Sequence, residues 1–349
     1  MGLKRVCAIG HYDSGANPAN GQTIKTRTVT EELERCLGKA DVLRLDTRGG
    51  AAALLKAPFQ VLWALGRGRN VVLFPGLRGV RVFVPLLAAA NLLFKRSVHY
   101  VVIGGWLAEV LKRKRMLARQ LKGFDGIYVE TNTMKNALEQ MGFRNAAVMP
   151  NCKDLRMLRE EELIYPVREP YRLCTFSRIM RMKGIEDAVE AVRAVNARYG
   201  RTVYTLDIYG QVDLQETGWF EGLKAAFPDH IRCGGLVPYE KSVEVLKDYF
   251  ALLFPTRYAT EGLPGTILDA YAAGVPVLSA RWDSFSDIIS EGETGFGYES
   301  GNSEQLERLL LKIAQSPEAV LAMRPNCLAA ARQYRRERAV KVLLDRLDG

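Results

Sequence analysis

The feature that most constrains the fold of this 349-residue chain is a strand-then-helix order that repeats through both halves. Short apolar runs alternate with longer segments of helical spacing, and Gly, Pro and Asn mark the junctions. The strands predicted in the first half are residues 5–10, 41–47, 70–76, 97–105, 126–131 and 146–151. This order is typical of parallel strands with helices on both faces. We therefore expect two doubly wound α/β domains, joined near residues 163–171, where two prolines interrupt the pattern.

The composition is that of a soluble globular protein, with 48% hydrophobic and 25% charged residues. The six cysteines are scattered and form no C-x-x-C pair, which favours free thiols in a reducing cytoplasm. With three histidines and no H-E-x-x-H or D-x-D pattern, the sequence predicts no metal site. Because a strand already begins within the first ten residues, we expect no signal peptide.

One segment of the second half, residues 261–280, combines two acids with a turn suited to phosphate. Glu261 and Asp269 are separated by seven residues, and a Gly-Leu-Pro-Gly turn between them leads into a helix. The amides of Gly265 and Thr266 would point outward at the positive end of the helix dipole. Asp269, about one turn further on, could then reach a ribose hydroxyl. The combination suggests a nucleotide-sugar site. An ordinary capped α/β unit could carry the same residues, so this segment alone does not distinguish the two.

A second loop carries two cations where a strand is followed by a helix. Arg178 and Lys183 come after a strand that ends near Phe176, and the next helix opens at Gly184. Ligands bind outside the carboxyl ends of the strands in open α/β sheets, so both cations would face the space that the Gly265 amide faces. A guanidinium and an ammonium there would neutralise a diphosphate leaving group as its charge develops.

These two segments together resemble the C-terminal domain of GT-B glycosyltransferases of the retaining family four, the glycosyl transferases group 1. That family carries an Arg-x-x-x-x-Lys-Gly loop and a Glu–seven–Glu motif. The segments between them follow in the same order: TLDIYG at 205–210, CGGLVP at 233–238 and VLKDYFALLFPT at 245–256. The resemblance is clear over residues 171–298 and continues more faintly through DGIYVETNTMKNALEQMGF and VMPN in the first half. Bacterial capsule and exopolysaccharide transferases are the most similar members.

The resemblance implies a GT-B fold, in which two Rossmann-like, doubly wound parallel-sheet domains face a central cleft. Residues 1–166 would form a basic, membrane-facing, acceptor-binding domain, and residues 167–325 would form the donor-binding domain. Residues 326–349 would form a terminal helix that crosses back to the first domain, as is common in GT-B proteins.

The resemblance also implies a reaction. We expect a hexosyltransferase that moves a sugar from a nucleotide diphosphate sugar, a UDP-sugar, to a saccharide or lipid-linked acceptor with retention of configuration. No cofactor and no metal are expected, because side chains and helix ends meet the phosphate charge in this class. Arg178 and Lys183 would hold the diphosphate together with the amides of Gly265 and Thr266.

Further roles follow from the same resemblance. Glu261 would bind the hydroxyls of the donor sugar. Asp269 would bind the ribose, and it stands where the family has Glu, one methylene longer. The base would be contacted by the backbone of Leu236, Val237 and Pro238.

On the acceptor side, the resemblance points to two loops of the first domain. In the family, the loop after the first strand carries small residues that let donor phosphates and acceptor approach the backbone. The matching residues are Asn20, Gly21 and Gln22. A plain flexible loop is the alternative. Dinucleotide binding is disfavoured, because the loop has no G-x-G-x-x-G pattern.

The second acceptor-side loop follows the fourth strand, where many relatives have a His. This chain has no His at that turn, and His99 lies within the strand, where we expect it to be packed. We expect the acceptor pocket to be shaped there by Gly104, Gly105 and Trp106.

Positive charge is concentrated in the first half. Residues 1–150 hold 23 Lys and Arg against 10 Asp and Glu, whereas the remainder holds 26 against 29. An apolar run of 13 residues, 82–94, lies within the basic part and is shorter than the roughly 20 that a spanning helix needs. As a helix with basic ends it could rest on an anionic membrane face, or it could be a core helix. A second basic stripe follows at Lys112, Arg113, Lys114 and Arg115, at the start of residues 112–122, whose helical spacing predicts a helix.

We therefore expect a cytoplasmic protein held peripherally on the inner face of the plasma membrane. Its expected ligands are a nucleotide sugar and a polyprenyl-linked or saccharide acceptor. Nucleic acid is disfavoured, because the basic stripe has no interleaved aromatics and no nucleic-acid module surrounds it. Two alternatives stay open: a non-catalytic sugar-nucleotide-binding partner of another transferase, and a GT-B sugar-nucleotide epimerase. The presence of Glu261, Arg178 and Lys183 together favours the transferase.

Overall fold

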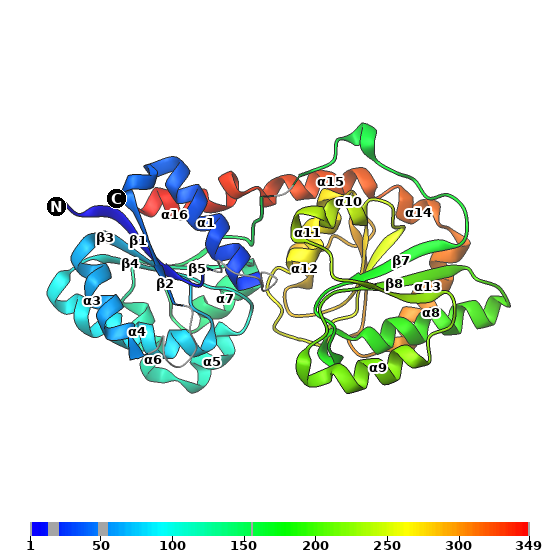
Figure 1. Cartoon of the computed structure of the whole chain (residues 1–349), viewed down its shortest axis with the longest axis horizontal. Coiled ribbons are helices and arrows are strands. Elements are labelled where there is room, and N and C mark those ends of the chain that lie inside the picture. The colour runs from blue at the N-terminus through cyan, green and yellow to red at the C-terminus, as the bar shows by residue number, and fades with distance from the viewer. Residues whose placement is uncertain (1, 13–20, 48–54, 155, 348–349) are drawn as a thin grey trace. The chain divides into compact units, whose positions relative to one another are not determined.

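The computed structural model describes the chain except for residues 1, 13–20, 48–54, 155 and 348–349. The chain forms two compact units. The first unit comprises Met1–Asp154, Thr260–Gly265 and Tyr334–Gly349, and the second comprises Leu155–Ala259 and Thr266–Gln333. Each unit is built on a six-stranded sheet with helices packed against it (Figure 1).

The sheet of the first unit is parallel, with strand order β2-β1-β3-β4-β5-β6. Its strands are β1 (Lys4–Gly10), β2 (Val42–Asp46), β3 (Gly68–Leu73), β4 (Ser97–Val101), β5 (Gly126–Val129) and β6 (Ala146–Val148). Nearly every side chain of β3 and β5 is buried, which is the pattern of a sheet covered on both faces. The strands predicted for the first half are thereby confirmed.

Successive residues of β1 enter different cores, because side chains alternate across a strand. Val6 and Ala8 pack with α1 (Gly21–Leu37) and α16 (Arg336–Leu347), whereas Cys7 and Ile9 belong to the core on the other face. The helices of that second core are α3 (Ala57–Arg67), α4 (Leu77–Phe94), α5 (Leu107–Arg113), α6 (Arg115–Lys122) and α7 (Asn132–Gln140).

The second unit repeats the same plan, with strand order β12-β11-β10-β7-β8-β9. Its strands are β7 (Tyr171–Phe176), β8 (Tyr204–Tyr209), β9 (Ile231–Gly235), β10 (Ala251–Phe254), β11 (Val277–Ala280) and β12 (Gly295–Tyr298). Its α-helices are α8 (Ile185–Tyr199), α9 (Thr217–Ala225), α10 (Ser242–Leu246), α11 (Gly265–Ala272), α12 (Phe285–Ile288), α13 (Ser303–Gln315), α14 (Glu318–Leu321) and α15 (Arg324–Ala331). Short 3₁₀ helices in the chain are η1 (Lys39–Asp41), η2 (Glu160–Glu162), η3 (Arg181–Lys183), η4 (Leu214–Glu216), η5 (Tyr239–Lys241) and η6 (Arg332–Tyr334).

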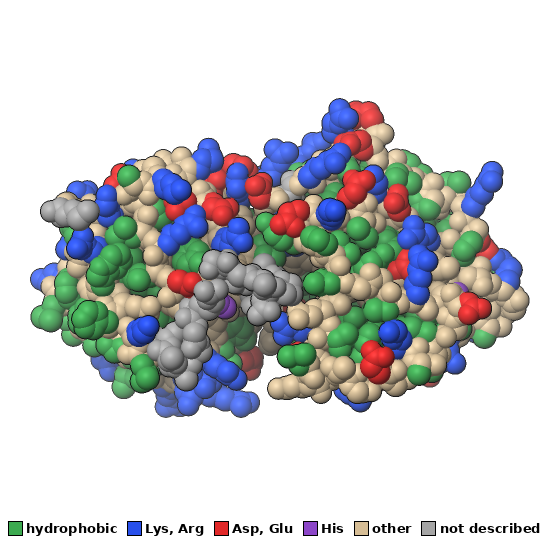
Figure 2. Space-filling view, viewed as in Figure 1, with side chains coloured by type: hydrophobic (Ala, Val, Ile, Leu, Met, Phe, Trp, Pro, Cys, Tyr) green, Lys and Arg blue, Asp and Glu red, His purple; other side chains and the backbone are tan. Residues whose placement is uncertain are grey.

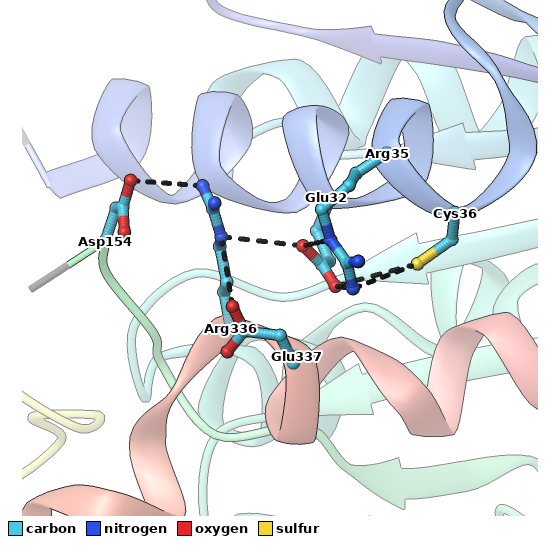
Figure 3. Close-up of polar contacts among 6 residues, drawn as sticks. All are labelled: Glu32, Arg35, Cys36, Asp154, Arg336 and Glu337. Carbon is cyan, nitrogen blue, oxygen red and sulfur yellow. Dashed lines mark hydrogen bonds and ion pairs between the residues drawn. The ribbon is translucent and has the colours of Figure 1, made fainter.

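The C-terminal helix α16 is fastened to the first unit by a polar network around Arg336 (Figure 3). The Nε atom of Arg336 lies 3.5 Å from Glu32 Oε2, and its Nη1 lies 3.2 Å from Asp154 Oδ2. Glu32, on α1, is 1% exposed and accepts a hydrogen bond of 2.9 Å from Arg35 Nε. The hydrogen bonds from Arg35 lower the pKa of the Glu32 carboxyl. The network thus ties the last helix to the first.

The boundary between the units lies at Asp154, earlier than the predicted 166/167. Residues 156–166 pack on the second unit: Leu158 N donates to Ala272 O at 2.9 Å, and Leu163 lies against Gly274. The two prolines that suggested the linker come after this stretch. At the other end, residues 334–349, rather than 326–349, join the first unit.

Two helices differ from their predicted form. The basic stripe does not form one helix, because Lys114 (φ −121°, ψ 70°) separates α5 from α6. The helix α4 has 18 residues, longer than the apolar run of 82–94, and among the described residues it alone has the length and hydropathy to cross a membrane. Core helices pass the same test, and α4 does bury Val80, Phe83, Val84 and Leu87 in the first unit.

Candidate donor site and acceptor-side loops

The cationic loop that follows β7 is held rigidly by backbone hydrogen bonds. Ile179 N donates to Gln211 O at 2.9 Å, and Asp213 N donates to Ile179 O at 3.0 Å. Further along, Arg257 N donates to Met182 O at 2.9 Å. The loop is therefore fixed on both sides, by the chain after β8 and by the chain after β10, at the carboxyl edge of the sheet where α/β folds bind ligands.

The side chains of the two predicted cations on this loop, Arg178 and Lys183, have different surroundings. Arg178 is half-exposed, and its Nη1 lies 3.5 Å from Asp213 Oδ2. Lys183 Nζ lies 5.6 Å from the Phe254 ring centroid and 5.1 Å from the Tyr258 ring centroid, at cation–π distance from both. An exposed ion pair such as Arg178–Asp213 contributes about 1 kcal/mol at most. The ion pair therefore leaves the Arg178 guanidinium available to an anionic ligand at small cost.

Gly184 completes the loop in a conformation that only glycine adopts readily. Its φ is +65°, and a Cβ added there would lie 1.8 Å from Pro255 O. The left-handed conformation disfavours any other residue, and the close approach to Pro255 forbids a side chain. The Lys-Gly pair of the sequence motif is thus explained by backbone geometry, which sets where Lys183 stands before α8 begins.

We expect Gly184→Ala to destabilise the second unit by ~2 kcal/mol or more, since conformational strain adds to steric overlap. Gly200→Ala is the matched control, because Gly200 has φ +62° but no atom within 4 Å of an added Cβ. It should cost about 1 kcal/mol, from strain alone. Urea unfolding of both variants checks this. Equal losses in the two variants would contradict a special role for the Pro255 contact.

The helix α11 places two further predicted residues in the second unit. Asp269 is 3% exposed and lies on the helix among buried apolar neighbours. The Thr266 hydroxyl, in the first turn, is buried and makes no hydrogen bond to any residue that the structure describes. A buried polar group without a partner is costly in a folded protein, and a ligand oxygen at this helix end would supply one.

The residues predicted to contact the base follow β9 at the same edge of the sheet. Gly235, with φ +74°, ends the strand, and its carbonyl accepts from Gly210 N at 2.9 Å. Leu236 is 57% exposed, and Pro238 precedes η5. Leu236 and Pro238 are exposed and Val237 is half-buried, so the three residues form a partly exposed loop at the carboxyl end of the strand.

Glu261 belongs to a short stretch, the Glu261 segment (Thr260–Gly265), which is grouped with the first unit by its contacts. Leu263 N donates to Glu130 Oε2 at 2.8 Å, and Asn151 Nδ2 donates to Leu263 O at 3.0 Å. Both glycines of the segment lie close to side chains of this unit: a Cβ on Gly262 would lie 2.0 Å from Glu130 Oε2, and one on Gly265 would lie 2.7 Å from Lys153 Cε. Glu261 itself is half-buried.

Four of the residues around the Glu261 segment were missed by the sequence reasoning: Lys25, Glu130, Asn151 and Lys153. Glu130 and Asn151 do fall in the two faint first-half matches, DGIYVETNTMKNALEQMGF and VMPN. These faint matches are the only sequence pattern that includes Glu130 and Asn151. No local pattern could indicate their contacts, because each contact joins residues more than a hundred positions apart.

The structure describes only part of the two predicted acceptor-side loops. Asn20 lies outside the described residues. Gln22, at the start of α1 beside Gly21, donates from Nε2 to Phe74 O at 3.4 Å. Trp106 Nε1 donates to Ile103 O at 2.8 Å, and Gly104 has φ +81°. A Cβ on Gly105 would lie 2.3 Å from Thr260 O, so this loop supports the Glu261 segment directly.

His99 is packed, as predicted. It is 1% exposed within β4, and its Nδ1 lies 3.2 Å from the Tyr128 hydroxyl. Burial lowers the pKa of His99 to about 4. The ring is therefore neutral at pH 7. Within the described residues, no group of three or more His, Cys, Asp or Glu side chains could hold a metal ion.

The basic stripe lies on α5 and α6 of the first unit. Lys112 forms an ion pair with Glu109, its neighbour on α5, and remains 60% exposed. The next three basic residues are also exposed: Arg113, Lys114 and Arg115.

Comparison with known proteins adds independent findings. The family model of glycosyl transferases group 1 matches residues 164–333. The amylovoran biosynthesis glycosyltransferase AmsK of Erwinia amylovora is 26% identical over 190 residues, covering 52% of this chain and 46% of AmsK. The putative colanic acid biosynthesis glycosyltransferase WcaL of Salmonella typhimurium is 23% identical over 150 residues, covering 42% and 36%. The chain thus matches less than half the length of these curated relatives.

A solved structure matches nearly the whole chain. The structure of Anabaena Alr3699/HepE in complex with UDP has a TM-score of 0.75 and 14% identity, and the match covers 99% of this chain and 100% of that one. HepE has also been solved in complex with UDP and glucose. Residues 164–333 of this chain are a glycosyl transferases group 1 domain, and the chain as a whole has the two-sheet architecture of GT-B glycosyltransferases.

Proposed function

We propose that this chain is a retaining glycosyltransferase that transfers a sugar from a nucleotide diphosphate sugar, a UDP-sugar, to a saccharide or polyprenyl-linked acceptor in polysaccharide synthesis. The observation that carries the proposal is the rigid Arg178–Gly184 loop at the carboxyl edge of a group 1 domain. It presents two cations where this fold binds ligands. HepE, which has the same fold, binds UDP and glucose, and AmsK and WcaL are named for exopolysaccharide synthesis.

The donor diphosphate is held in this proposal by Arg178, Lys183 and the start of α11. The Thr266 hydroxyl, which is buried and makes no bond to any described residue, donates to a phosphate oxygen. The Gly265 and Thr266 amides add the positive end of the helix dipole. Together these groups stabilise the charge that develops on the leaving diphosphate, which is the largest electrostatic demand of the reaction.

The transfer itself requires no nucleophilic carboxylate. The bond between the anomeric carbon and the donor phosphate breaks, and a bond from that carbon to the acceptor hydroxyl oxygen forms on the same face of the sugar. The hydroxyl proton passes to the departing phosphate oxygen. Glu261 binds sugar hydroxyls and orients the ring, so that its contribution is positioning rather than covalent chemistry.

The experiment that tests the proposal is turnover of a panel of nucleotide sugars, measured as release of the nucleoside diphosphate. We expect release from one UDP-sugar. In the glycoside product, the anomeric proton signal of the transferred sugar should show the same configuration as in the donor. Release with inverted configuration would overturn the retaining mechanism, and turnover of no UDP-sugar would overturn the donor assignment.

We further propose that the first unit rests on an anionic membrane surface on the cytoplasmic side. Large apolar side chains are exposed on three of its helices: Phe59 and Trp63 of α3, Leu92 and Leu93 of α4, and Met116 of α6. These five residues, here called the apolar patch, range from 39% to 84% exposed. Figure 2 shows hydrophobic and basic side chains interspersed over the part of this unit where α3 and α4 lie in Figure 1.

A groove of about 380 Å³ lies within this region of the first unit. Leu92 and Met116 line it from two helices, and Arg119 and Gln120 add polar groups. Apolar walls beside a guanidinium suit a lipid whose chain and anionic headgroup lie close together. The groove therefore supports a lipid-linked acceptor more than a free saccharide.

We expect the protein to sediment with phosphatidylglycerol vesicles at low salt and to be released as salt screens the attraction. Changing Lys112, Arg113, Lys114 and Arg115 to Glu should abolish binding, since each basic residue near the surface contributes about 1 kcal/mol. The matched control changes Arg193, Arg198, Arg308 and Lys312, exposed on α8 and α13 of the second unit, to Glu. It alters the net charge equally and should retain binding. Equal loss in both variants, or no binding by the wild type, contradicts the proposed surface.

A further inference from the structure

We infer that Lys25 and Glu130 are positioning residues for sugar transfer, because together they hold the Glu261 segment in place. The inference rests on the proposed function for its effect on turnover, whereas the holding of the segment is tested independently of activity. Neither residue belongs to the sequence motifs of the second half. Lys25 and Glu130 would act on the reaction through Leu263 and Glu261.

The first observation is a buried ion pair at the carboxyl edge of the first sheet. Lys25 on α1 is 1% exposed, and Glu130, directly after β5, is 4% exposed. Lys25 Nζ donates to Glu130 Oε1 at 2.6 Å and to Val102 O at 3.0 Å. The ammonium thus fixes one oxygen of the carboxylate and ties it to the chain after β4.

The second observation is that the other carboxylate oxygen reaches the Glu261 segment. Glu130 Oε2 accepts from Leu263 N at 2.8 Å, and Asn151 Nδ2 donates to Leu263 O at 3.0 Å. Both backbone polar groups of Leu263 are therefore bound by side chains of the first unit. Hydrogen bonds to an ionised carboxylate are stronger and shorter than those between neutral groups. The backbone two residues after Glu261 is consequently fixed.

The third observation is that the segment fits with no spare space. A Cβ on Gly262 would lie 2.0 Å from Glu130 Oε2, and one on Gly105 would lie 2.3 Å from Thr260 O and 2.8 Å from Glu261 O. Glycines at both positions let the segment lie directly against the carboxylate and the loop after β4. A small shift of Glu130 must therefore move the backbone that carries Glu261.

A purely structural role explains these residues less well. Buried ion pairs lose much of their attraction to desolvation, and apolar residues of similar volume often stabilise a fold as well or better. An apolar pair would, however, give the Leu263 amide no acceptor. The combination of Lys25 and Glu130 is explained if the reaction needs a fixed hydrogen-bond acceptor for the Leu263 amide.

The test compares Glu130→Asp with Glu32→Asp. Aspartate keeps the charge at position 130 but is one methylene shorter, so it cannot reach Lys25 and Leu263 together. Glu32 is the matched control, because it is a buried, ion-paired glutamate of the same unit that contacts Arg35 and Arg336 instead (Figure 3). Both variants lose a similar contact, but only the first releases the Glu261 segment.

We expect Glu130→Asp to lower kcat by about 10- to 100-fold, the effect of misplacing a group by roughly 1 Å. The KM for the donor should change by less than about 3-fold, because the donor cations remain in place. In Glu32→Asp, kcat should stay within about 2-fold of the wild type, even where its melting temperature falls equally. Equal kcat values in the two variants would overturn the inference.

Amide hydrogen exchange tests directly whether Glu130 holds the Glu261 segment in place. Exchange at Leu263 should be slow in the wild type and in Glu32→Asp, and fast in Glu130→Asp. If wild-type protein turns over no nucleotide sugar, the proposed function fails, and this exchange still shows whether Glu130 holds the segment. Slow exchange in Glu130→Asp overturns the inference, as does fast exchange with unchanged kcat.

A second variant guards against failure of Glu130→Asp to fold. Lys25→Met with Glu130→Gln removes both charges together, so no uncompensated buried charge remains. The Gln carbonyl can still accept from Leu263 N, but the Lys25 ammonium no longer fixes it, so exchange at Leu263 should be faster and kcat lower than in the wild type. Slow exchange with wild-type kcat would overturn the role of Lys25. Fast exchange at Leu263 with wild-type kcat in this double variant would overturn the role of the segment in turnover.

Discussion

Glu261→Gln is expected to lower sugar transfer by about 10²–10³-fold, the loss seen when one group that stabilises a transition state is removed. The substitution keeps the size of the side chain but removes its charge and replaces one acceptor oxygen with an NH2 donor, so hydroxyls of the donor sugar lose a charged acceptor. The affinity for UDP alone should stay nearly intact, because UDP contains no donor sugar. Initial rates with the UDP-sugar and calorimetry with UDP measure the two effects separately.

Asp269 should behave in the opposite way. Asp269→Asn is expected to weaken the binding of UDP itself, since the proposed partner of Asp269 is the ribose. Equal behaviour of the Glu261 and Asp269 variants toward UDP would show that the two acids do not have separate roles. Asp269→Glu restores the residue typical of the family and should keep UDP binding. Because Asp269 is 3% exposed, the added methylene should cost about 1–3 kcal/mol of stability.

The second large effect is expected at the cationic loop. Arg178→Ala and Lys183→Ala should each weaken UDP binding by about 1.5–3 kcal/mol, the range for hydrogen bonds to charged groups. That corresponds to roughly 10- to 150-fold in Kd. The motivation is their shared place on the loop between β7 and α8, which backbone hydrogen bonds hold on both sides. Calorimetric titration with UDP measures the change.

Arg181→Ala is the matched control for these two variants. Arg181 lies in the same loop, but its guanidinium stacks 5.0 Å from the Trp219 ring centroid and its Nη1 lies 3.5 Å from Glu186 Oε1. Its partners are thus protein groups, and its loss should leave the UDP affinity within about 2-fold. Unchanged affinity in both Arg178→Ala and Lys183→Ala would remove these residues from the donor site. A loss in Arg181→Ala as large as theirs would point to damage to the loop.

The sheets and the loops at their carboxyl edges could be predicted from the sequence because they leave local patterns. Strands such as Gly126–Val129 are buried along their whole length, so they stand out as apolar runs. Gly184 marks a strand-to-helix turn because no other residue fits its conformation and its contact with Pro255. The family match over 164–333 agrees with the part of the sequence where these patterns were clearest.

The support of the Glu261 segment could not be predicted. The hydrogen bond from Leu263 to Glu130 joins residues 133 positions apart, and neither residue type is unusual where it stands. The break at Lys114 was missed for another reason: residues 112–122 have helical spacing throughout, and no Gly or Pro marks the point where α5 ends. The roles of the site residues toward donor and acceptor stay predictions.

The central claim is that Arg178 and Lys183 bind the diphosphate of the nucleotide-sugar donor of a glycosyltransferase. Mass spectrometry of the purified protein after incubation with a panel of nucleotide sugars tests it most directly. The wild type should retain one UDP-sugar, and the Arg178→Ala, Lys183→Ala double variant should retain none of the panel. Retention of no nucleotide sugar by the wild type, or equal retention by both proteins, would contradict the claim.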